Sequence, residues 1–179
     1  MLKLIYNKLN LKILETKNKK EVFEEVEQYI KSIVGITSKD ISRPWGGFLV
    51  INEEDAEVFI AEFFPHLTKE DLSISGKLSP KILLVEPGKK LSWQYHHRRA
   101  EIWKLIYGTA GVVISDDDTE KEIVTLKQGD IIELKQGERH RLVGLKEGWG
   151  IIAEIWRHTD AENPSDEDDI VRVQDDFGR

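Results

Sequence analysis

Short apolar segments, each bounded by glycine or by acidic turns, follow one another at regular intervals from Lys81 to the end of the chain. Each is only four to seven residues long, which is the usual length of a strand. Many short strands separated by turn residues are typical of antiparallel sandwiches and closed barrels. The predicted strands are 82–85, 91–96, 101–107, 111–115, 123–126, 131–134, 139–143, 151–156 and 170–173. The sequence therefore predicts a mainly β fold with an antiparallel barrel.

The N-terminal part of the chain carries a helical pattern instead. Residues 18–21 read as a capping box, apolar residues then recur at helical spacing to Ile33, and Gly35 offers a stop. Residues 41–51 are predicted to form a turn that leads into a strand. A second helix is predicted over 56–63, and residues 1–17 are predicted to form an extended arm. We expect an arm and amphipathic helix at 1–40 and a barrel at 41–179, joined in one compact domain.

Composition excludes several classes of function. The net charge of −7 argues against general nucleic-acid binding, and no apolar run is long enough for a membrane span. The chain has no cysteine and no visible secretory signal, which excludes disulfides and fits the cytoplasm.

Two polar stretches among the predicted strands suggest a metal site. Gln94 and His96 are two apart, so an extended strand projects both to the same face. Glu101 follows at the next strand, and His140 ends a second glycine-punctuated segment. One amide oxygen, two imidazoles and one carboxylate suit a divalent cation, and Zn²⁺ is the expected ion.

The same stretches are rich in basic residues, although the whole chain is acidic. A positively charged cleft can capture a small anion, and Arg43, Lys90 and Arg99 are candidate contacts for a phosphate. His97 has the opposite strand parity to His96 and should not bind the same ion. It is equally compatible with a role behind the metal ligands, a substrate contact or a surface position.

Both stretches resemble the paired motifs of the cupin superfamily, which implies a jelly-roll barrel. The first motif is matched by Gly88, His96, Glu101 and Gly108, with Gln94 in its first histidine position, and the second by Gly129, Gly137 and His140. The Arg43-Pro-Trp-Gly46 turn, the run Leu91 to Glu101, and the segment from Asp168 to Arg179 further resemble the isomerase domain of type II phosphomannose isomerases. Arg98 and Ile102 depart from that pattern, which puts the identity of the sugar in doubt.

This resemblance implies a metal-dependent ketol-isomerase that interconverts mannose 6-phosphate and fructose 6-phosphate through an enediol. It marks Arg172 as catalytic, through electrostatic stabilisation, while His97, a carboxylate or a metal-bound water could be the base. Alternatives are an isomerase of glucose 6-phosphate or a heptose phosphate, and a non-catalytic cupin that binds a sugar phosphate; Gln94 disfavours a metal oxygenase. A homodimer is expected, because barrels of this superfamily commonly pair.

Overall fold

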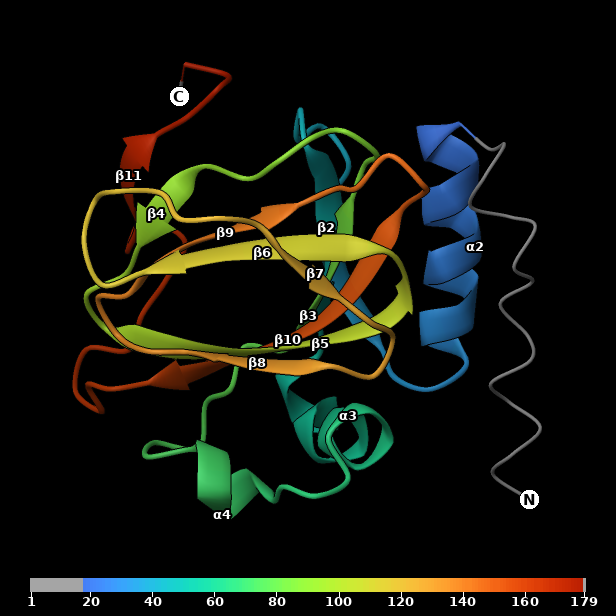
Figure 1. Cartoon of the computed structure of the whole chain (residues 1–179). Helices are drawn as coiled ribbons and strands as arrows, with labels where there is room; N and C mark the ends of the chain where they lie inside the picture. The colour runs from blue at the N-terminus through green and yellow to red at the C-terminus, as the bar shows by residue number, and fades with distance from the viewer. Residues whose placement is uncertain (1–17, 179) are drawn as a thin grey trace.

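The computed structural model describes residues 18–178 and arranges them as two antiparallel sheets packed face to face, with helices on the outside (Figure 1). The six-stranded sheet has the order β1-β2-β3-β10-β5-β8, and the five-stranded sheet has the order β11-β4-β9-β6-β7. Every strand pairing is antiparallel. The predicted mainly β fold is therefore confirmed as a two-sheet jelly roll.

The strands of the six-stranded sheet are β1 (Ile36–Asp40), β2 (Gly46–Ile51), β3 (Lys81–Val85), β10 (Gly150–His158), β5 (Arg99–Gly108) and β8 (Ile131–Leu134). Those of the other sheet are β11 (Val171–Gln174), β4 (Trp93–Tyr95), β9 (Arg139–Val143), β6 (Ala110–Ser115) and β7 (Val124–Leu126). The predicted strands agree with these to within a few residues at each end. Strand β1 was not predicted.

The helices are α2 (Lys19–Lys31), a short 3₁₀ turn η2 (Glu53–Asp55), α3 (Ala56–Phe63) and α4 (Lys69–Leu72). The predicted capping box is present, since the Asn18 side chain accepts from the Glu21 N–H and the Glu21 carboxylate accepts from the Asn18 N–H. Helix α2 ends at Lys31, four residues before Gly35. The predicted stop at Gly35 is thus too late. The predicted arm at 1–17 lies outside the described residues.

Apolar side chains form two main cores, one on each face of the six-stranded sheet. The outer core packs α2 and α3 onto the sheet through residues such as Phe23, Phe59 and Leu84. The inner core fills the space between the two sheets, with residues such as Leu83 and Leu142. Side chains alternate along a strand, so every second residue of β3, β5 and β10 points into the space between the sheets. At one end of this space the inward-pointing residues are polar.

Strand β1 pairs with β2, so residues 36–40 form part of the barrel's larger sheet. The predicted boundary between an N-terminal part at 1–40 and a barrel at 41–179 falls between these two paired strands. This division of the chain stays a prediction. Within the described part of the chain, no helix combines the length and the apolar character needed to cross a bilayer.

The turn before β2 depends on Gly46. Its φ of +139° lies in the region that favours glycine, and a Cβ there would lie 1.9 Å from the carbonyl oxygen of Leu84 on β3. The chain can therefore run tightly against β3 and present Arg43 and Trp45 to the space between the sheets, where both line a cavity.

Candidate metal centre and adjoining cavity

Three buried side chains from separate strands meet inside one end of the barrel. His96 follows β4, Glu101 lies on β5 of the opposite sheet, and His140 lies on β9. Their ligand atoms all lie within 4.8 Å of one another. The pairing of Gln94 with His140 fixes β4 beside β9, and the packing of the two sheets brings Glu101 across to them.

Both histidines turn the same ring nitrogen towards Glu101. The Nδ1 of His96 lies 2.6 Å from the carbonyl oxygen of Asp169, and the Nδ1 of His140 lies 2.9 Å from that of Glu138. A carbonyl oxygen only accepts, so each Nδ1 carries a hydrogen, and in a neutral ring the Nε2 then presents a lone pair. Burial lowers the pKa of His96, which favours the neutral ring.

The Nε2 atoms lie close to the Glu101 oxygens without good hydrogen bonds. The His96 Nε2 is 3.2 Å from Oε1, and the His140 Nε2 is 3.4 Å from Oε2. Glu101 Oε2 and His140 Nε2 are buried with no hydrogen-bond partner. Buried polar atoms without partners are costly, and a cation would satisfy both. The donor set therefore fits a divalent metal ion.

Glu101 is held in its charged form. Burial raises the pKa of its carboxyl, but positive charge nearby, from His96 when this ring is protonated and from Arg99, outweighs burial and holds the pKa well below its usual value. The Arg99 Nε donates to Glu101 Oε1 at 2.7 Å, and its Nη2 lies 3.2 Å from the His96 Nε2. Arg99 thus supplies positive charge beside the cluster, and a cation bound there would replace its contact with His96.

A loop of residues 159–170, which connects β10 to β11, forms hydrogen bonds that fix the position of His96 and of the residues that follow it. The Asp169 carboxylate accepts from the backbone N–H groups of His97 and Arg98 and from the Ser165 hydroxyl. The same residue's carbonyl orients His96. Such partners behind a ligand fix its tautomer and direction.

Gln94 lies next to the cluster rather than pointing away from it. It stands opposite His140 on β9 and opposite Arg172 on β11, so the three side chains form a row across the small sheet. Its side-chain oxygen accepts from the Ser92 hydroxyl at 2.6 Å and retains a second lone pair. Its place in a metal's ligand set stays a prediction.

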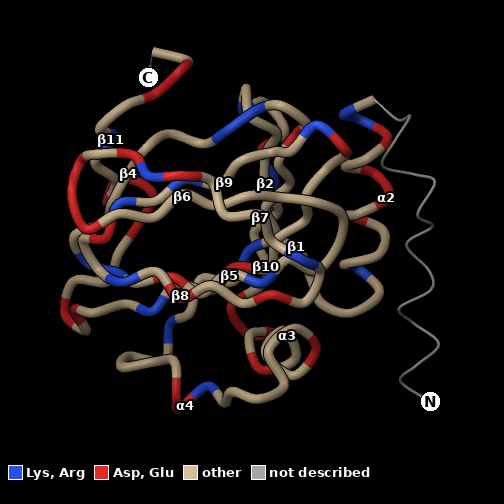
Figure 2. The backbone as a smooth tube through the Cα atoms, viewed as in Figure 1, with Lys and Arg blue, Asp and Glu red and all other residues tan. Residues whose placement is uncertain are grey.

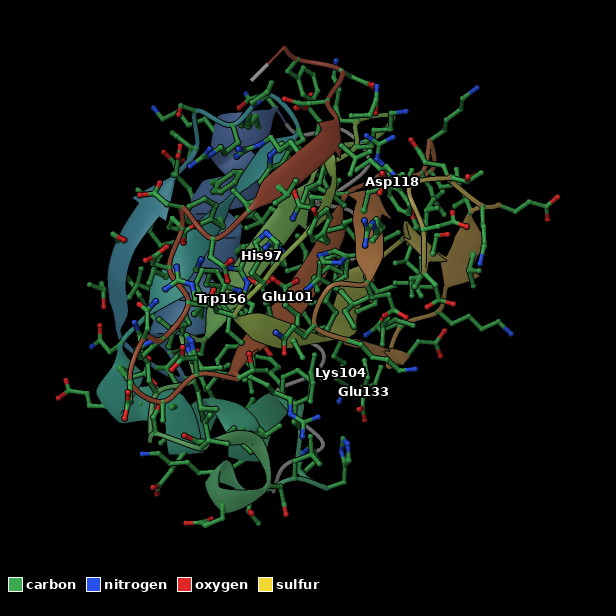
Figure 3. All side chains as sticks on the ribbon, turned by 90° about the vertical axis from the view of Figure 1, so that its left-hand side faces the viewer. His97, Glu101, Lys104, Asp118, Glu133 and Trp156 are labelled. Carbon is green, nitrogen blue, oxygen red and sulfur yellow. The ribbon has the colours of Figure 1, made fainter. Side chains whose placement is uncertain are left out.

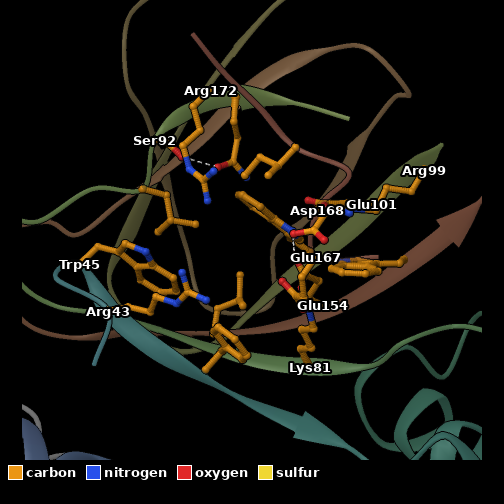
Figure 4. A pocket seen from close by; sticks show the side chains of 17 residues that line it. Arg43, Trp45, Lys81, Ser92, Arg99, Glu101, Glu154, Glu167, Asp168 and Arg172 are labelled. Atoms are coloured by element: carbon orange, nitrogen blue, oxygen red, sulfur yellow. Dashed lines mark hydrogen bonds and ion pairs between the residues drawn. The ribbon is translucent and has the colours of Figure 1, made fainter. Parts of the chain in front are cut away.

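A cavity of about 330 Å³ opens beside Glu101 (Figure 4). Cationic, acidic and aromatic side chains share its wall. It is lined by Arg43, Trp45, Phe48, Lys81, Leu83, Leu91, Ser92, Gln94, Arg99, Glu101, Trp103, Glu154, Trp156, Glu167, Asp168, Ile170 and Arg172.

The residues predicted to contact a substrate divide into two groups. Arg43, Arg99 and Arg172 line the cavity. Lys90 is paired with Asp176 at 3.4 Å and is not part of the lining. His97 is exposed, and its ring packs edge-on against Tyr95 with 5.3 Å between centroids. Of the roles left open for His97, its position fits a surface residue.

The cavity also contains residues that the sequence prediction missed. Lys81 and Glu154 stand opposite each other on β3 and β10, and Trp156 stands opposite Glu101 on β5 (Figure 3). Glu154 interrupts an otherwise apolar strand from Ile151 to Trp156. A carboxylate in such a strand was the available signal, because ionisable residues are seldom buried without a role or a partner.

Glu154 holds its proton more tightly than a free glutamate does. Burial raises the pKa of its carboxyl to about 7, and the nearby charge of Glu101 acts in the same direction. The Trp103 indole N–H donates to its Oε1 at 2.9 Å.

Many of the basic residues outside the cavity are neutralised locally. Basic and acidic positions crowd together at the β4 and β11 end of the barrel (Figure 2). Arg98 pairs with Asp166, and Arg139 pairs with Asp118. Basic residues that line the cavity also have acidic partners, since Arg43 pairs with Asp40, Lys81 with Glu167 and Arg99 with Glu101. The positively charged cleft predicted from the clustering of charges is therefore one in which basic and acidic side chains alternate.

Comparison with known proteins identifies related sequences. The sequence profile of the family described as "Mannose-6-phosphate isomerase C-terminal" matches residues 34–175. The mannose-1-phosphate guanylyltransferase of Escherichia coli K12 is 30% identical over 141 residues, which are 79% of this chain and 23% of that protein. The alginate biosynthesis protein AlgA of Pseudomonas putida is 28% identical over 95% of this chain and 31% of its own length. The chain thus spans about a quarter to a third of these relatives.

Solved structures support the fold. The capsular polysaccharide assembling protein CapF of Staphylococcus aureus superposes with a TM-score of 0.51 at 12% identity, covering 77% of this chain and 34% of that one. The oxalate decarboxylase of Lactobacillus farciminis superposes with a TM-score of 0.50 at 15% identity, covering 75% and 33% of the two chains. At such identities the likeness concerns the fold alone, and it agrees with the predicted cupin-type jelly roll.

The names of the relatives correct the predicted activity. The sequence predicted a ketol-isomerase acting on mannose 6-phosphate, or on another hexose or heptose phosphate. The curated relatives are instead named for guanylyl transfer to mannose 1-phosphate and for polysaccharide biosynthesis. These names contradict the isomerase prediction, which is therefore wrong. The catalytic roles given to Arg172 and His97 were tied to that reaction.

Proposed function

This chain belongs to the mannose-6-phosphate isomerase C-terminal family, and we propose that it is a metal-dependent domain that binds a mannose phosphate. Its ligand would be mannose 1-phosphate or a closely related phosphosugar, and it would act alongside the guanylyl transfer for which its relatives are named. The observation that carries this proposal is a cavity that is lined by four basic side chains and shares Glu101 with a cluster suited to a divalent ion.

The chemistry of the cavity supports a phosphorylated ligand. Arg43, Lys81, Arg99 and Arg172 reach it from four different strands or turns (Figure 4). Guanidinium groups present several donors in a plane and suit phosphate oxygens. The indole rings of Trp45 and Trp156 provide flat surfaces against which the C–H face of a sugar can pack.

The size of the cavity supports a monosaccharide phosphate over a nucleotide sugar. Its volume of about 330 Å³ lies at the lower end of the roughly 300–1,000 Å³ of typical ligand sites. A nucleotide sugar is more than twice the size of a sugar phosphate and would exceed it. The nucleotide of a guanylyl transfer would then bind elsewhere than in this cavity.

The proposed ligands of the metal are His96, Glu101 and His140, with the Gln94 amide oxygen as a fourth donor. Imidazole and carboxylate donors of this kind suit Zn²⁺, which remains our expected ion. A bound cation would act as a Lewis acid towards oxygens of the sugar. Arg43, Arg99 and Arg172 are proposed to hold the ligand. For Arg172 this is supported by its pairing with Gln94, which in turn stands opposite His140.

Calorimetric titration of metal-loaded protein tests the proposal. Mannose 1-phosphate and mannose 6-phosphate should bind, whereas unphosphorylated mannose and GTP should bind far more weakly. Replacing Arg172 by Gln should weaken mannose phosphate binding roughly tenfold or more, because a charge-assisted contact is lost. Arg157→Gln is the matched control, since Arg157 lies outside the cavity and pairs with Glu133.

Binding of GTP but not of mannose phosphates would overturn the proposal. So would equal binding by the Arg172→Gln and Arg157→Gln proteins. A homodimer and a cytoplasmic location stay predictions.

A further inference from the structure

Lys81 is a buried cation at one side of the cavity. It is the first residue of β3, and its side chain is only 5% exposed. The ammonium nitrogen lies 3.7 Å from the centroid of the Trp156 ring and 5.2 Å from that of Phe48. Aromatic faces stabilise an ammonium group, but a cation buried to this extent also needs an anion beside it.

The anion is provided from outside the barrel. The Lys81 ammonium forms an ion pair with Glu167, which lies in the loop 159–170. The Glu167 side chain is 59% exposed, in contrast to that of Lys81. Glu154, which stands opposite Lys81 on β10, accepts from the Trp103 indole. Both carboxylates lie near Lys81, but Glu154 is buried whereas Glu167 is exposed, so Glu167 is the partner that a ligand can replace.

The loop is anchored on both sides of Glu167. Before it, Ser165 receives a hydrogen bond from Arg99, and Asp166 pairs with Arg98. After it, the Asp169 carboxylate accepts from two backbone N–H groups. The loop can therefore stay in place while the Glu167 side chain turns from the cavity into solvent.

The charges of the cavity favour a phosphate as the replacement. Four cationic residues line it, and so do four acidic ones, of which Glu167 and Asp168 come from the loop. A phosphate monoester carries a charge of about −2 near neutral pH. It would replace the charge of the two loop carboxylates, if these turned outwards, so the net charge of the cavity would stay the same.

We propose that Lys81 anchors the phosphate group of the ligand and that Glu167 occupies the same position as an internal competing anion until the ligand displaces it. The inference rests on the proposed function, since it concerns the same cavity. Beyond that function, Lys81 is named as the residue that contacts the phosphate, and Glu167 as the loop residue that lowers the affinity for it.

The test compares binding of inorganic phosphate and of mannose 1-phosphate by calorimetry, at one fixed ionic strength. Glu167→Gln should bind both about fivefold more tightly, which corresponds to losing one partly exposed ion pair. Lys81→Met, which keeps the apolar contact with Trp156, should bind both roughly ten- to a hundredfold more weakly. In the Lys81→Met background, Glu167→Gln should bring no further gain.

Glu162→Gln is the control for the loop charge, since Glu162 is exposed in the same loop and does not line the cavity. Lys81→Arg should recover part of the lost binding. An equal gain in phosphate affinity for Glu162→Gln and Glu167→Gln would overturn the inference, because the gain would then come from the net charge of the loop and not from the contact of Glu167 with Lys81. No change in Glu167→Gln, or no phosphate binding in any variant, would overturn it as well. Inorganic phosphate binding that follows the predicted order, without mannose phosphate binding, would refute the proposed function alone.

Discussion

Replacing Glu154 by Gln should stabilise the metal-free protein, and the gain should grow with pH. The pKa of Glu154 in the fold is about 7, whereas the model value for a free glutamate is 4.5. Below pH 4.5 both folded and unfolded chains are protonated, so the residue has no effect. As pH rises from 4.5 to 7, the unfolded chain loses this proton first, and the folded state becomes less favourable. Above pH 7 the cost reaches about 3 kcal/mol.

Glutamine carries no such cost and retains an oxygen that can accept from the Trp103 indole, as Glu154 does at 2.9 Å. Urea unfolding of chelator-treated protein from pH 4.5 to above pH 7 measures the difference. The difference between Glu154→Gln and wild type should approach zero at the acid end and rise to about 3 kcal/mol at the alkaline end. Glu133→Gln is the control for removing a glutamate charge, because Glu133 is exposed on β8. A difference for Glu154→Gln that is flat, or that falls with rising pH, would refute the reasoning.

Other predictions concern the parts that support the site. Asp169→Asn should weaken metal binding by about ten- to a hundredfold in a chelator competition, because it disturbs the loop that orients His96; unchanged affinity would contradict this. Gly46→Ala should destabilise the fold by more than about 2 kcal/mol in urea unfolding, because its Cβ would meet the Leu84 carbonyl; a neutral effect would show that the turn can relax. The pKa of His158 is lowered to about 4, first by burial and then by nearby basic residues. Its contribution to stability should therefore be present above pH 6.5 and be lost as pH falls towards 4, by about 3 kcal/mol, relative to His158→Gln.

Much of the barrel could be predicted from local patterns. The strand at 131–134 and that at 139–143 were predicted with the observed bounds, because turn residues mark both ends. Strand β1 was missed because its residues Ile36–Asp40 are mostly polar and exposed, and only pairing with β2 makes them a strand. Here hydrogen bonding to the neighbouring strand determines the secondary structure, and local composition does not.

The cluster of candidate ligands also followed from the sequence, since strand parity and the cupin-like spacing point to His96, Glu101 and His140. The rest of the cavity did not follow. Lys81 and Glu154 become neighbours only through the register of β3 with β10, which no local pattern contains. Lys90 lies close to the motif in sequence, yet pairs with Asp176 near the chain's end. Proximity along the chain was a poor guide to which charges face the cavity.

X-ray absorption spectroscopy of the metal-loaded protein tests the central claim most directly, because it reports the atoms bound to the ion. We predict two imidazole nitrogens, from His96 and His140, together with oxygen donors, and one imidazole fewer in His140→Ala. A spectrum with oxygen donors alone, or one that is unchanged in His140→Ala, would show that the ion binds elsewhere and would contradict the proposed metal centre.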